Sequence, residues 1–459
     1  MEEFEAIIIG AGQAGVPLAK QLAGAGWKTA LIEKRAVGGT CINDGCTPTK
    51  TMVASARVAY LAGKSQEYGL EIPSFSLNFK QVMDRKDDVV KQFRGGSESG
   101  IKKTENLTLI YGVASFTGPK TLTIESEGTS RELSAKYIFI NTGASAIIPD
   151  IEGVHDIPYL TNTSILELED LPEHLLIVGA GYVSLEFGQM FRRFGANVTI
   201  IEHGDRLLAK EDTDVCESIS EILEQEDIQV LINTQTLKFE QIADGKIKVT
   251  LDVNGTERSE ICSHVLLATG RAPQTASLGL EHTKIQTDKH GHIKVNDKLE
   301  TDEQGVYALG DVKGGPAFTH ISYNDFVVVS KNLLKNANLS ITNRPVPYCM
   351  FTDPQLGRIG ISEEDAAKQG INYLVAKLPM KNVARGIENN ETRGYMKAIV
   401  DKDSKQILGA TIIAEQGGEV MTMLQLAMTG KIPYDDIRYM IFAHPLYAES
   451  LNNLFMSID

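Results

Sequence analysis

The chain opens with a run of apolar residues that leads into a glycine-rich turn. Residues 4–9 predict a strand, residues 10–15 form the turn, and a helical pattern of apolar positions then extends to about residue 25. A second apolar run over residues 28–32 predicts another strand. This order of strand, turn, helix and strand predicts a βαβ unit with parallel strands.

The same succession recurs later in the chain. Residues 174–178 predict a strand, residues 179–184 form a second glycine turn, and apolar residues at helical spacing follow. Residues 197–201 predict the closing strand. Two such units indicate an α/β protein with two Rossmann-like dinucleotide-binding domains.

The remaining patterns divide the rest of the chain. Between the two units, residues 107–124 and 133–140 alternate as short strands, and from about Pro345 strand-like and helical runs alternate as in a separate α+β domain. We therefore expect four segments: a first part of one dinucleotide-binding domain, a second such domain, a return to the first, and a C-terminal domain. Their expected bounds are 1–150, 151–272, 273–344 and 345–459.

Composition narrows the class of protein. The 459 residues are 42% hydrophobic and 23% charged, which is ordinary for a globular protein, and the net charge of -15 disfavours binding to nucleic acid or to an anionic membrane surface. No apolar stretch approaches the roughly 20 residues that span a bilayer. The first residues lack the positive charge of a secretion signal, and cysteine is sparse, so we expect a cytoplasmic protein.

The first glycine turn has every feature of a dinucleotide-binding loop. Gly10 permits the tight turn, Gly12 lets the backbone approach a pyrophosphate, and Gly15 lets helix and strand pack closely. The phosphates would lie at the helix N-terminus, where free N–H groups converge. Glu33 follows at the distance expected of the carboxylate that binds the ribose hydroxyls.

The second turn is nearly complete. It has Gly179 and Gly181, Ser184 replaces the third glycine, and Glu202 is the acidic residue. A carboxylate at Glu202 would bond a 2′-hydroxyl and repel a 2′-phosphate, which favours NADH over NADPH. Arg206 lies close by in sequence and acts against that preference.

Two cysteines follow the first unit. Cys41 and Cys46 are five residues apart, and on one ideal helix they would point roughly 140° away from each other. A disulfide between them therefore requires Cys41 at or before the start of a helix, which Gly45 and Pro48 mark. Cys46 would then lie where the helix dipole lowers a thiol pKa, with Lys50 one turn further on the same face. The sequence thus predicts a redox-active pair rather than two packing residues.

The run from Gly38 to Lys50 resembles the active-site signature of the class I pyridine nucleotide–disulfide oxidoreductases. Residues 301–311 are similar to the family's second flavin motif, and residues 444–449 resemble its catalytic His–Pro segment. The resemblance covers essentially the whole chain. It implies FAD and NAD domains, a C-terminal interface domain, and a homodimer whose active site is shared between subunits.

The same resemblance assigns roles to individual residues. It implies that Cys41 is the interchange thiol, that Cys46 lies nearest the flavin, and that Lys50 pairs with Glu186. It implies that His444, oriented by Glu449, acts as acid and base for the partner subunit's cysteines. The further residues that it places at FAD or NAD(H) are Lys34, Gly39, Thr40, Ala114, Thr142, Gly143, Gly270, Arg271, Gly310, Asp311, Ala317, Thr319 and the gate-like Tyr182.

Within the family, three stretches resemble the mercuric-reductase-like proteins and the reactive-chlorine-resistance flavoproteins that are linked to copper reduction. These stretches are residues 318–322, 385–394 and 449–455. No cysteine follows Cys349, whereas a complete mercuric reductase ends in a metal-delivering cysteine pair. Leu446 stands where dihydrolipoyl dehydrogenases usually have Thr after the His–Pro pair.

Three hypotheses remain open at this point. The chain could pass electrons from NAD(P)H through FAD and the cysteine pair to a metal ion, or to a small-molecule disulfide as a dihydrolipoyl dehydrogenase does. It could also be a flavin-bound redox sensor without turnover. We expect no resident metal ion, and the sequence does not identify the electron acceptor.

Overall fold

The computed structural model describes residues 1–458 and contains three assemblies of sheet and helix. The first is a seven-stranded sheet in the order β3-β2-β1-β6-β5-β4, with β16 paired to the far half of β6. Strands β1, β2, β3, β6 and β16 are parallel, whereas β4 and β5 form an antiparallel edge. The strand bounds are β1 Glu2–Ile9, β2 Thr29–Glu33, β3 Leu107–Tyr111, β4 Val113–Gly118, β5 Thr121–Ser126, β6 Thr129–Ile140 and β16 Val306–Ala308.

This first sheet is covered on both faces. Ile7 and Ile8 are successive residues of β1 that point to opposite faces, and both are fully buried. Helix α1 (Gly15–Gly24) packs beside α7 (Thr319–Lys335) on one face. The chain reaches β16 and α7 only after passing through the second assembly.

The second assembly holds the second glycine turn. Its four-stranded parallel sheet has the order β10-β9-β8-β14, and an antiparallel three-stranded sheet, β11-β12-β13, lies beside it. A small two-stranded sheet, β15-β7, lies where the chain passes between the two assemblies. The strand bounds are β7 Ala144–Ala146, β8 His174–Val178, β9 Asn197–Ile201, β10 Gln229–Leu231, β11 Thr234–Gln241, β12 Ile247–Val253, β13 Thr256–Cys262, β14 His264–Leu267 and β15 Arg271–Pro273; the helices are α5 Tyr182–Phe194 and α6 Thr213–Glu224.

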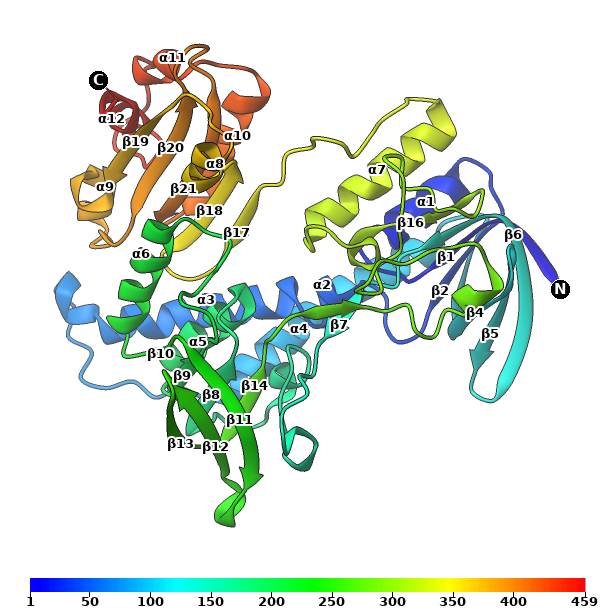
Figure 1. The fold of residues 1–459 in the computed structure, drawn as a ribbon, viewed down its shortest axis with the longest axis horizontal. Helices are drawn as coiled ribbons and strands as arrows, with labels where there is room; N and C mark the ends of the chain where they lie inside the picture. Colours follow the sequence, from blue (N-terminus) through cyan, green and yellow to red (C-terminus); the bar gives the residue numbers. More distant parts are fainter. Residues whose placement is uncertain (459) are drawn as a thin grey trace.

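The C-terminal domain is built on a five-stranded antiparallel sheet, β17-β18-β21-β20-β19, shown in orange and yellow in Figure 1. Helices pack against it, and α10 contacts both β18 and β21. The bounds are β17 Tyr348–Met350, β18 Gln355–Gly360, β19 Tyr373–Pro379, β20 Tyr395–Asp401, β21 Ile407–Ala414, α8 Glu363–Lys368, α9 Ala384–Glu388, α10 Gly417–Thr429, α11 Tyr434–Arg438 and α12 Ser450–Met456.

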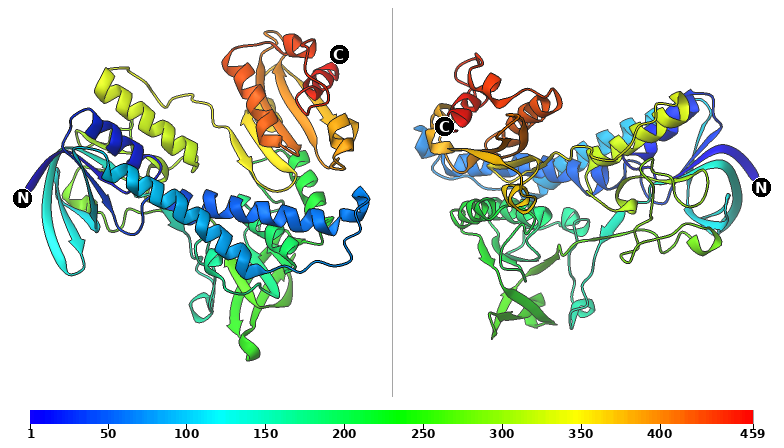
Figure 2. Two further views of the ribbon diagram at one scale, coloured as in Figure 1. Left: turned by 180° about the vertical axis from the view of Figure 1, so that it is seen from behind. Right: turned by 45° about the horizontal axis from the view of Figure 1, so that its top comes forward.

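Two long helices connect the three assemblies. Helices α3 (Cys46–Gly63) and α4 (Phe79–Lys102) run side by side from the first assembly toward the C-terminal domain, as the left view of Figure 2 shows. Helix α3 also packs against α5. The short helix α2 (Gly39–Asn43) precedes α3. The cysteine pair therefore lies at the end of a helix that touches all three parts of the fold.

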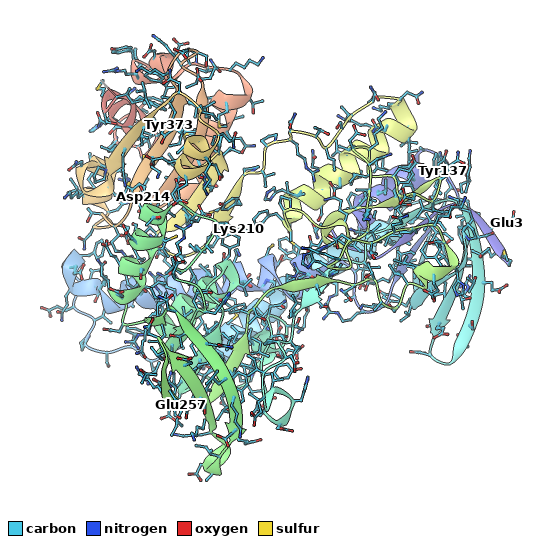
Figure 3. All side chains as sticks on the ribbon, in the orientation of Figure 1. Glu3, Tyr137, Lys210, Asp214, Glu257 and Tyr373 are labelled. Atoms are coloured by element: carbon cyan, nitrogen blue, oxygen red, sulfur yellow. The ribbon has the colours of Figure 1, made fainter. Side chains whose placement is uncertain are left out.

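Buried ion pairs hold the C-terminal domain against the second assembly. Lys397 is 1% exposed, and its Nζ lies 2.8 Å from the carboxylate of Asp214, a residue of α6 that is labelled in Figure 3. On the other side, Arg193 of α5 donates at 2.7 Å to both Glu226 and Asp353. Because removing one partner of a buried pair leaves an uncompensated charge, these contacts fix the relative position of the domains.

Candidate functional site

A cavity runs along the first glycine turn to the start of α3. Most of the cofactor-binding and catalytic residues predicted from the sequence border it, although they come from segments far apart in the chain. These residues are Gly10, Gly12, Glu33, Lys34, Gly39, Thr40, Cys41, Cys46, Lys50, Ala114, Thr142, Gly143, Glu186, Gly270, Arg271, Asp311, Ala317 and Thr319.

The turn has the features that an extended dinucleotide such as FAD requires. Helix α1 begins directly after the glycine turn, so the positive end of its dipole lies beside the cavity that the turn borders; its first amide, that of Gly15, already donates to Oδ1 of Asn141. A Cβ at Gly10 would lie 2.3 Å from the carbonyl oxygen of Asn141, and one at Gly39 would lie 2.8 Å from the Cα of Gly12. Only glycine permits this close approach of the backbone segments that border the cavity. The residues present therefore fit FAD.

Glu33 is fixed where a ribose-binding carboxylate should be. It lies at the end of β2, and its Oε2 accepts a hydrogen bond of 2.9 Å from the amide of Ala11 in the glycine turn. Its Oε1 accepts one of 2.8 Å from the amide of Arg35. These bonds orient the carboxylate beside the turn.

Gly15 and Gly310 do not border the cavity; they contact residues that do. A Cβ at Gly15 would lie 2.0 Å from the carbonyl oxygen of Gly10, so this glycine permits the close packing of helix and strand. The amide of Gly310 donates to Asp325 at 2.8 Å. Asp311 does border the cavity, where its carboxylate accepts a 2.9 Å bond from Arg271.

The cysteine pair lies at a junction of two helices. Cys41 lies within α2, and Cys46 is the first residue of α3. The predicted helix start at Cys46 is thus confirmed, and a separate short helix allows both sulfur atoms to border one cavity. The Sγ of Cys46 lies 3.3 Å from the Thr319 hydroxyl, which comes from the start of α7.

The surroundings make the two thiols unequal. The Cys41 thiol donates to Cys46 and lowers the pKa of Cys46 to about 6, against the penalty of burial; Thr319 and Lys50 act in the same direction as Cys41. That same bond, together with burial, raises the pKa of Cys41. At neutral pH, Cys46 is therefore the thiolate and Cys41 keeps its proton.

A charged pair lies on the cavity wall beside Cys46. The Nζ of Lys50 is 2.6 Å from the Oε2 of Glu186, a residue of α5. The other oxygen, Oε1, accepts a 2.8 Å bond from the amide of Phe351, and the Lys50 ammonium also lies 4.8 Å from the centre of the Phe351 ring. The pair implied by the family resemblance is thus formed, and a residue of the C-terminal domain holds it in place.

A second cavity follows the second glycine turn. It is bordered by Gly179, Gly181, Tyr182, Glu202 and Gly270. The N-terminus of α5 has no side-chain cap, and Glu202 accepts a 2.9 Å bond from the amide of Ala180, which repeats the Glu33 arrangement. Gly270 borders both cavities, so the two dinucleotide sites are adjacent.

Arg206 is turned away from this second cavity. Its guanidinium donates at 2.8 Å to Thr213 and at 3.2 Å to the carboxylate of Glu364. Arg206 does not border the cavity, whereas Glu202 does. Arg206, which in the sequence analysis acted against a preference for NADH, is therefore already paired with Glu364.

Tyr182 lies in an aromatic stack at the boundary of the two sites. Its ring centre is 5.6 Å from that of Tyr348 and 6.2 Å from that of Phe318, which borders the first cavity. Burial raises the pKa of Tyr182, so its hydroxyl stays protonated. The position is compatible with the gate-like role implied by the family resemblance.

His444 and Glu449 form their predicted pair, but at another surface of the chain. The Nδ1 of His444 lies 3.0 Å from both carboxylate oxygens of Glu449. The His444 side chain is 72% exposed and lies in the C-terminal domain, and it does not border the cysteine cavity. Within one chain, the structure does not bring this pair to Cys41 and Cys46.

Several cavity residues could not be recognised from the sequence. The amide oxygen of Asn141 accepts a 2.9 Å bond from the amide of Gly15, and its nitrogen donates at 2.9 Å to the carbonyl of Leu309. Phe351 donates a hydrogen bond to Glu186 through its main-chain amide. Any residue except proline could make this contact, so the identity of the side chain gives no hint of it. Arg35 and Asp44 border the cavity, as Asn141 does. In the sequence they look like ordinary charged surface residues, so nothing marks them as part of the site.

Two features are absent from residues 1–458. No group of three or more His, Cys, Asp or Glu side chains in this part of the chain is placed to hold a metal ion. None of its helices is long and apolar enough to cross a membrane.

Comparison with known proteins agrees with this geometry. The family model of the pyridine nucleotide-disulphide oxidoreductases matches residues 4–325, and the model of that family's dimerisation domain matches residues 346–455. The chain is 36% identical to the probable pyridine nucleotide-disulfide oxidoreductase RclA of Escherichia coli (strain K12), with 99% of each protein aligned. It is 32% identical to a mercuric reductase of Staphylococcus aureus, over 100% of this chain and 83% of the relative.

Solved structures give the same result. The Cu(II) complex of the HOCl-induced flavoprotein disulfide reductase RclA from Escherichia coli superposes with a TM-score of 0.92 at 35% identity, covering 99% of both chains. A dihydrolipoyl dehydrogenase of Arabidopsis thaliana is 30% identical over 99% of this chain and 90% of the relative. The chain therefore belongs to the pyridine nucleotide-disulphide oxidoreductases, FAD-dependent enzymes with two dinucleotide-binding domains and a C-terminal dimerisation domain.

Proposed function

We propose that this enzyme takes electrons from NADH in preference to NADPH and passes them through FAD to Cys41 and Cys46, and from there to a metal ion or a small-molecule disulfide. The observation that carries the proposal is the place of Cys46, the first residue of α3, beside Cys41 on the wall of the cavity along the first glycine turn; the Cys41 thiol, Thr319 and Lys50 lower the pKa of Cys46 to about 6 there. A thiolate held there at neutral pH is the form that exchanges with disulfides and binds soft metal ions.

FAD, when bound, supplies the two-electron carrier between the nicotinamide and the disulfide. Reduction of the Cys41–Cys46 disulfide breaks the S–S bond, takes up two electrons and one proton, and gives the Cys41 thiol and the Cys46 thiolate. Cys41 keeps its proton until it attacks or ligates the acceptor. Lys50, paired with Glu186, places a positive charge on the cavity wall beside the thiolate and stabilises it.

The preference for NADH is proposed from the second cavity. Glu202 borders it, and Arg206 is held by Thr213 and Glu364 outside it. A 2′-phosphate would meet the carboxylate without a guanidinium beside it, whereas a 2′-hydroxyl could donate to that carboxylate. His203 and Lys210 also border this cavity, and the Nδ1 of His203 lies 2.9 Å from the Glu202 carboxylate.

We propose further that the active unit is a homodimer in which His444 of one subunit serves the cysteines of the other. The dimerisation-domain match and the exposed His444–Glu449 pair support this. Large apolar side chains near that pair are also exposed, including Tyr439 at 72% and Ile441 at 98%. Such residues indicate a surface that a second copy covers. With a disulfide acceptor, His444 would protonate the leaving thiolate.

For the acceptor, we favour a metal ion. RclA is known as a Cu(II) complex and other relatives are mercuric reductases, and a pair of thiolates is a suitable ligand set for such ions. One Hg(II) ion or two Cu(II) ions would accept the two electrons of the dithiol. Dihydrolipoyl dehydrogenase stays the alternative, because relatives with that activity match across the chain. We also propose a cytoplasmic location, because cysteine is sparse, with five in 459 residues.

The test is a panel of Cu(II), Hg(II), lipoamide and oxidised glutathione, each assayed with NADH and with NADPH. We expect turnover of a metal ion with NADH and its loss in Cys46→Ser. Faster turnover of lipoamide than of either metal would replace the metal-reductase proposal with the dihydrolipoyl dehydrogenase alternative. Failure of NADH to change the flavin absorbance at all would favour a sensor without turnover.

A further inference from the structure

The loop between the two cysteines is anchored by an ion pair that the mechanism does not use. Arg35 donates to Asp44, two residues before Cys46, through both terminal nitrogens; the Nη1–Oδ1 distance is 2.9 Å. The two parallel bonds fix direction as well as distance. The Asp44 side chain is 11% exposed, whereas that of Arg35 is 52% exposed. The carboxylate is thus the buried partner and depends on Arg35 for compensation.

Arg35 belongs to the turn that begins at the Glu33 carboxylate. The Oε1 of Glu33 accepts hydrogen bonds from the amides of Arg35 at 2.8 Å and Ala36 at 3.3 Å. Its Oε2 is bonded to the amide of Ala11 in the glycine turn. One continuous series of polar contacts therefore runs from the glycine turn to the cysteine loop.

The backbone around Asp44 leaves little freedom to the sulfur atom that follows. The Asp44 carbonyl accepts a 3.1 Å bond from the side chain of Asn162, and its amide donates at 2.8 Å to the carbonyl of Thr40. A Cβ at Gly45 would lie 2.9 Å from that same Thr40 carbonyl oxygen. With Asp44 fixed on both sides, the start of α3 and hence Cys46 are fixed too.

We propose that Arg35 and Asp44 are positioning residues for electron exchange between the flavin and the cysteine pair. They hold the loop so that Cys46 faces the cavity in the thiolate–flavin geometry, and they couple this geometry to the turn at Glu33. The hydrogen bonds that Arg35 donates to Asp44 raise the pKa of Arg35 against the effect of burial, and the carboxylates of Glu33 and Glu167 raise it further, so the guanidinium stays charged. The inference rests on the proposed redox role of Cys41 and Cys46.

The unequal exposure of the partners predicts an unequal effect of their removal. Arg35→Met leaves a buried carboxylate without a partner beside the cysteines, which is costly. Asp44→Asn leaves a guanidinium that solvent can hydrate, and the amide can still bond neighbouring groups. The double variant removes both charges and should therefore be less impaired than Arg35→Met alone.

The experiment compares the reduction of two electron acceptors by the FAD-loaded protein, with activities expressed per bound FAD. Ferricyanide accepts electrons from the flavin directly, whereas the aromatic disulfide DTNB requires the cysteine dithiol. We expect Arg35→Met to lower NADH-dependent DTNB reduction by about tenfold, with the thiolate–flavin absorbance reduced in parallel. Ferricyanide reduction should stay within about twofold of the unchanged protein, and the double variant should recover most of the DTNB loss. Arg131→Met, which breaks the exposed pair with Glu2, is the matched control.

Three outcomes would overturn this inference. Unchanged DTNB turnover in Arg35→Met would show that the pair does not position the loop. Equal losses of ferricyanide and DTNB turnover would indicate a general defect of the FAD site. A double variant as impaired as the sum of the single variants would show that the two residues act independently. These outcomes can be told apart from a failure of the proposed function itself. In that case the unchanged protein would show no NADH-dependent DTNB reduction, and Cys46→Ser would have the same activity as the unchanged protein.

Discussion

The Cys41 thiol is expected to set the charge of Cys46, and this can be tested by replacing Cys41 alone. In Cys41→Ser, the hydroxyl can still donate a hydrogen bond to the Cys46 sulfur. In Cys41→Ala, the largest influence that lowers the pKa of Cys46 is removed, while Thr319 and Lys50 remain. Neither variant can form the disulfide, so Cys46 is a free thiol beside the oxidised flavin and can be titrated directly.

The expected magnitude follows from the pKa of about 6 for Cys46. A thiol of that pKa is about nine-tenths ionised at pH 7, whereas an ordinary thiol with a pKa near 8.5 is only about 3% ionised. Because the lowered pKa belongs to an acid, the thiolate is present above about pH 6 and is lost as the pH falls through that value. Loss of the Cys41 donor should move the midpoint upward, to between about 6 and 8.5.

The assay is the long-wavelength thiolate–flavin absorbance, recorded between pH 5 and 10, a range that includes both values. We expect a midpoint near 6 in Cys41→Ser, a midpoint at least about one unit higher in Cys41→Ala, and no band in Cys46→Ser. Equal midpoints in the Ser and Ala variants would refute the argument that a Cys41 hydrogen bond stabilises the thiolate.

Two further variants test other parts of the structure. Glu202→Ala should raise the KM for NADH about tenfold and affect NADPH less, because a charged hydrogen bond to the ribose is lost; steady-state kinetics with both nucleotides measures this, and an unchanged KM for NADH would contradict it. Arg193→Met should lower the free energy of unfolding by about 1–3 kcal/mol, because the buried carboxylates of Glu226 and Asp353 each lose one charged hydrogen-bond donor. Glu226 keeps Arg393 and Asp353 keeps Arg57, so neither carboxylate is left without a partner. Chemical denaturation measures that loss. As a control, Lys80→Met, which breaks the exposed ion pair with Asp84, should change the free energy of unfolding by no more than about 0.5 kcal/mol.

Local features of the fold were predictable because they depend on short-range patterns. The strands over residues 174–178 and 197–201 coincide with β8 and β9, since each is a short segment rich in leucine, isoleucine and valine that ends next to glycine or a polar residue. The early helix ends within a residue of its predicted limit. Boundaries elsewhere shift by one to four residues, as for β1 and β6, because edge residues pair with neighbours that a sequence window does not include.

The long helix α4 was not predicted, although its sequence contains the signals. Asn78 caps it by accepting a bond from the amide of Gln81, and buried Phe79, Met83 and Val90 follow at helical spacing. Most of its residues are polar, however, and two adjacent glycines interrupt the pattern near its end. Packing against α3 compensates for this weak local preference.

Some features of the candidate site were likewise predictable from local sequence patterns, and others were not. The glycine turns, Glu33, Glu202 and the cysteine pair are recognisable because the chemistry requires these residue types at fixed spacing. The contact between Glu186 and the amide of Phe351 joins residues 165 positions apart and uses main-chain atoms, so no local pattern reports it. The role of His444 cannot be checked in the same way. The family resemblance implies that it acts on the cysteines of a second subunit, and the structure contains one chain.

The central claim is that electrons from NADH arrive at Cys41 and Cys46. The most direct measurement is thiol labelling before and after anaerobic reduction of the air-oxidised protein by NADH, followed by peptide mapping. The account predicts a gain of two thiols per bound FAD, both on the peptide that contains Cys41 and Cys46. Reduction of the flavin without any gain of thiols there, or a gain at Cys216, Cys262 or Cys349 instead, would contradict it.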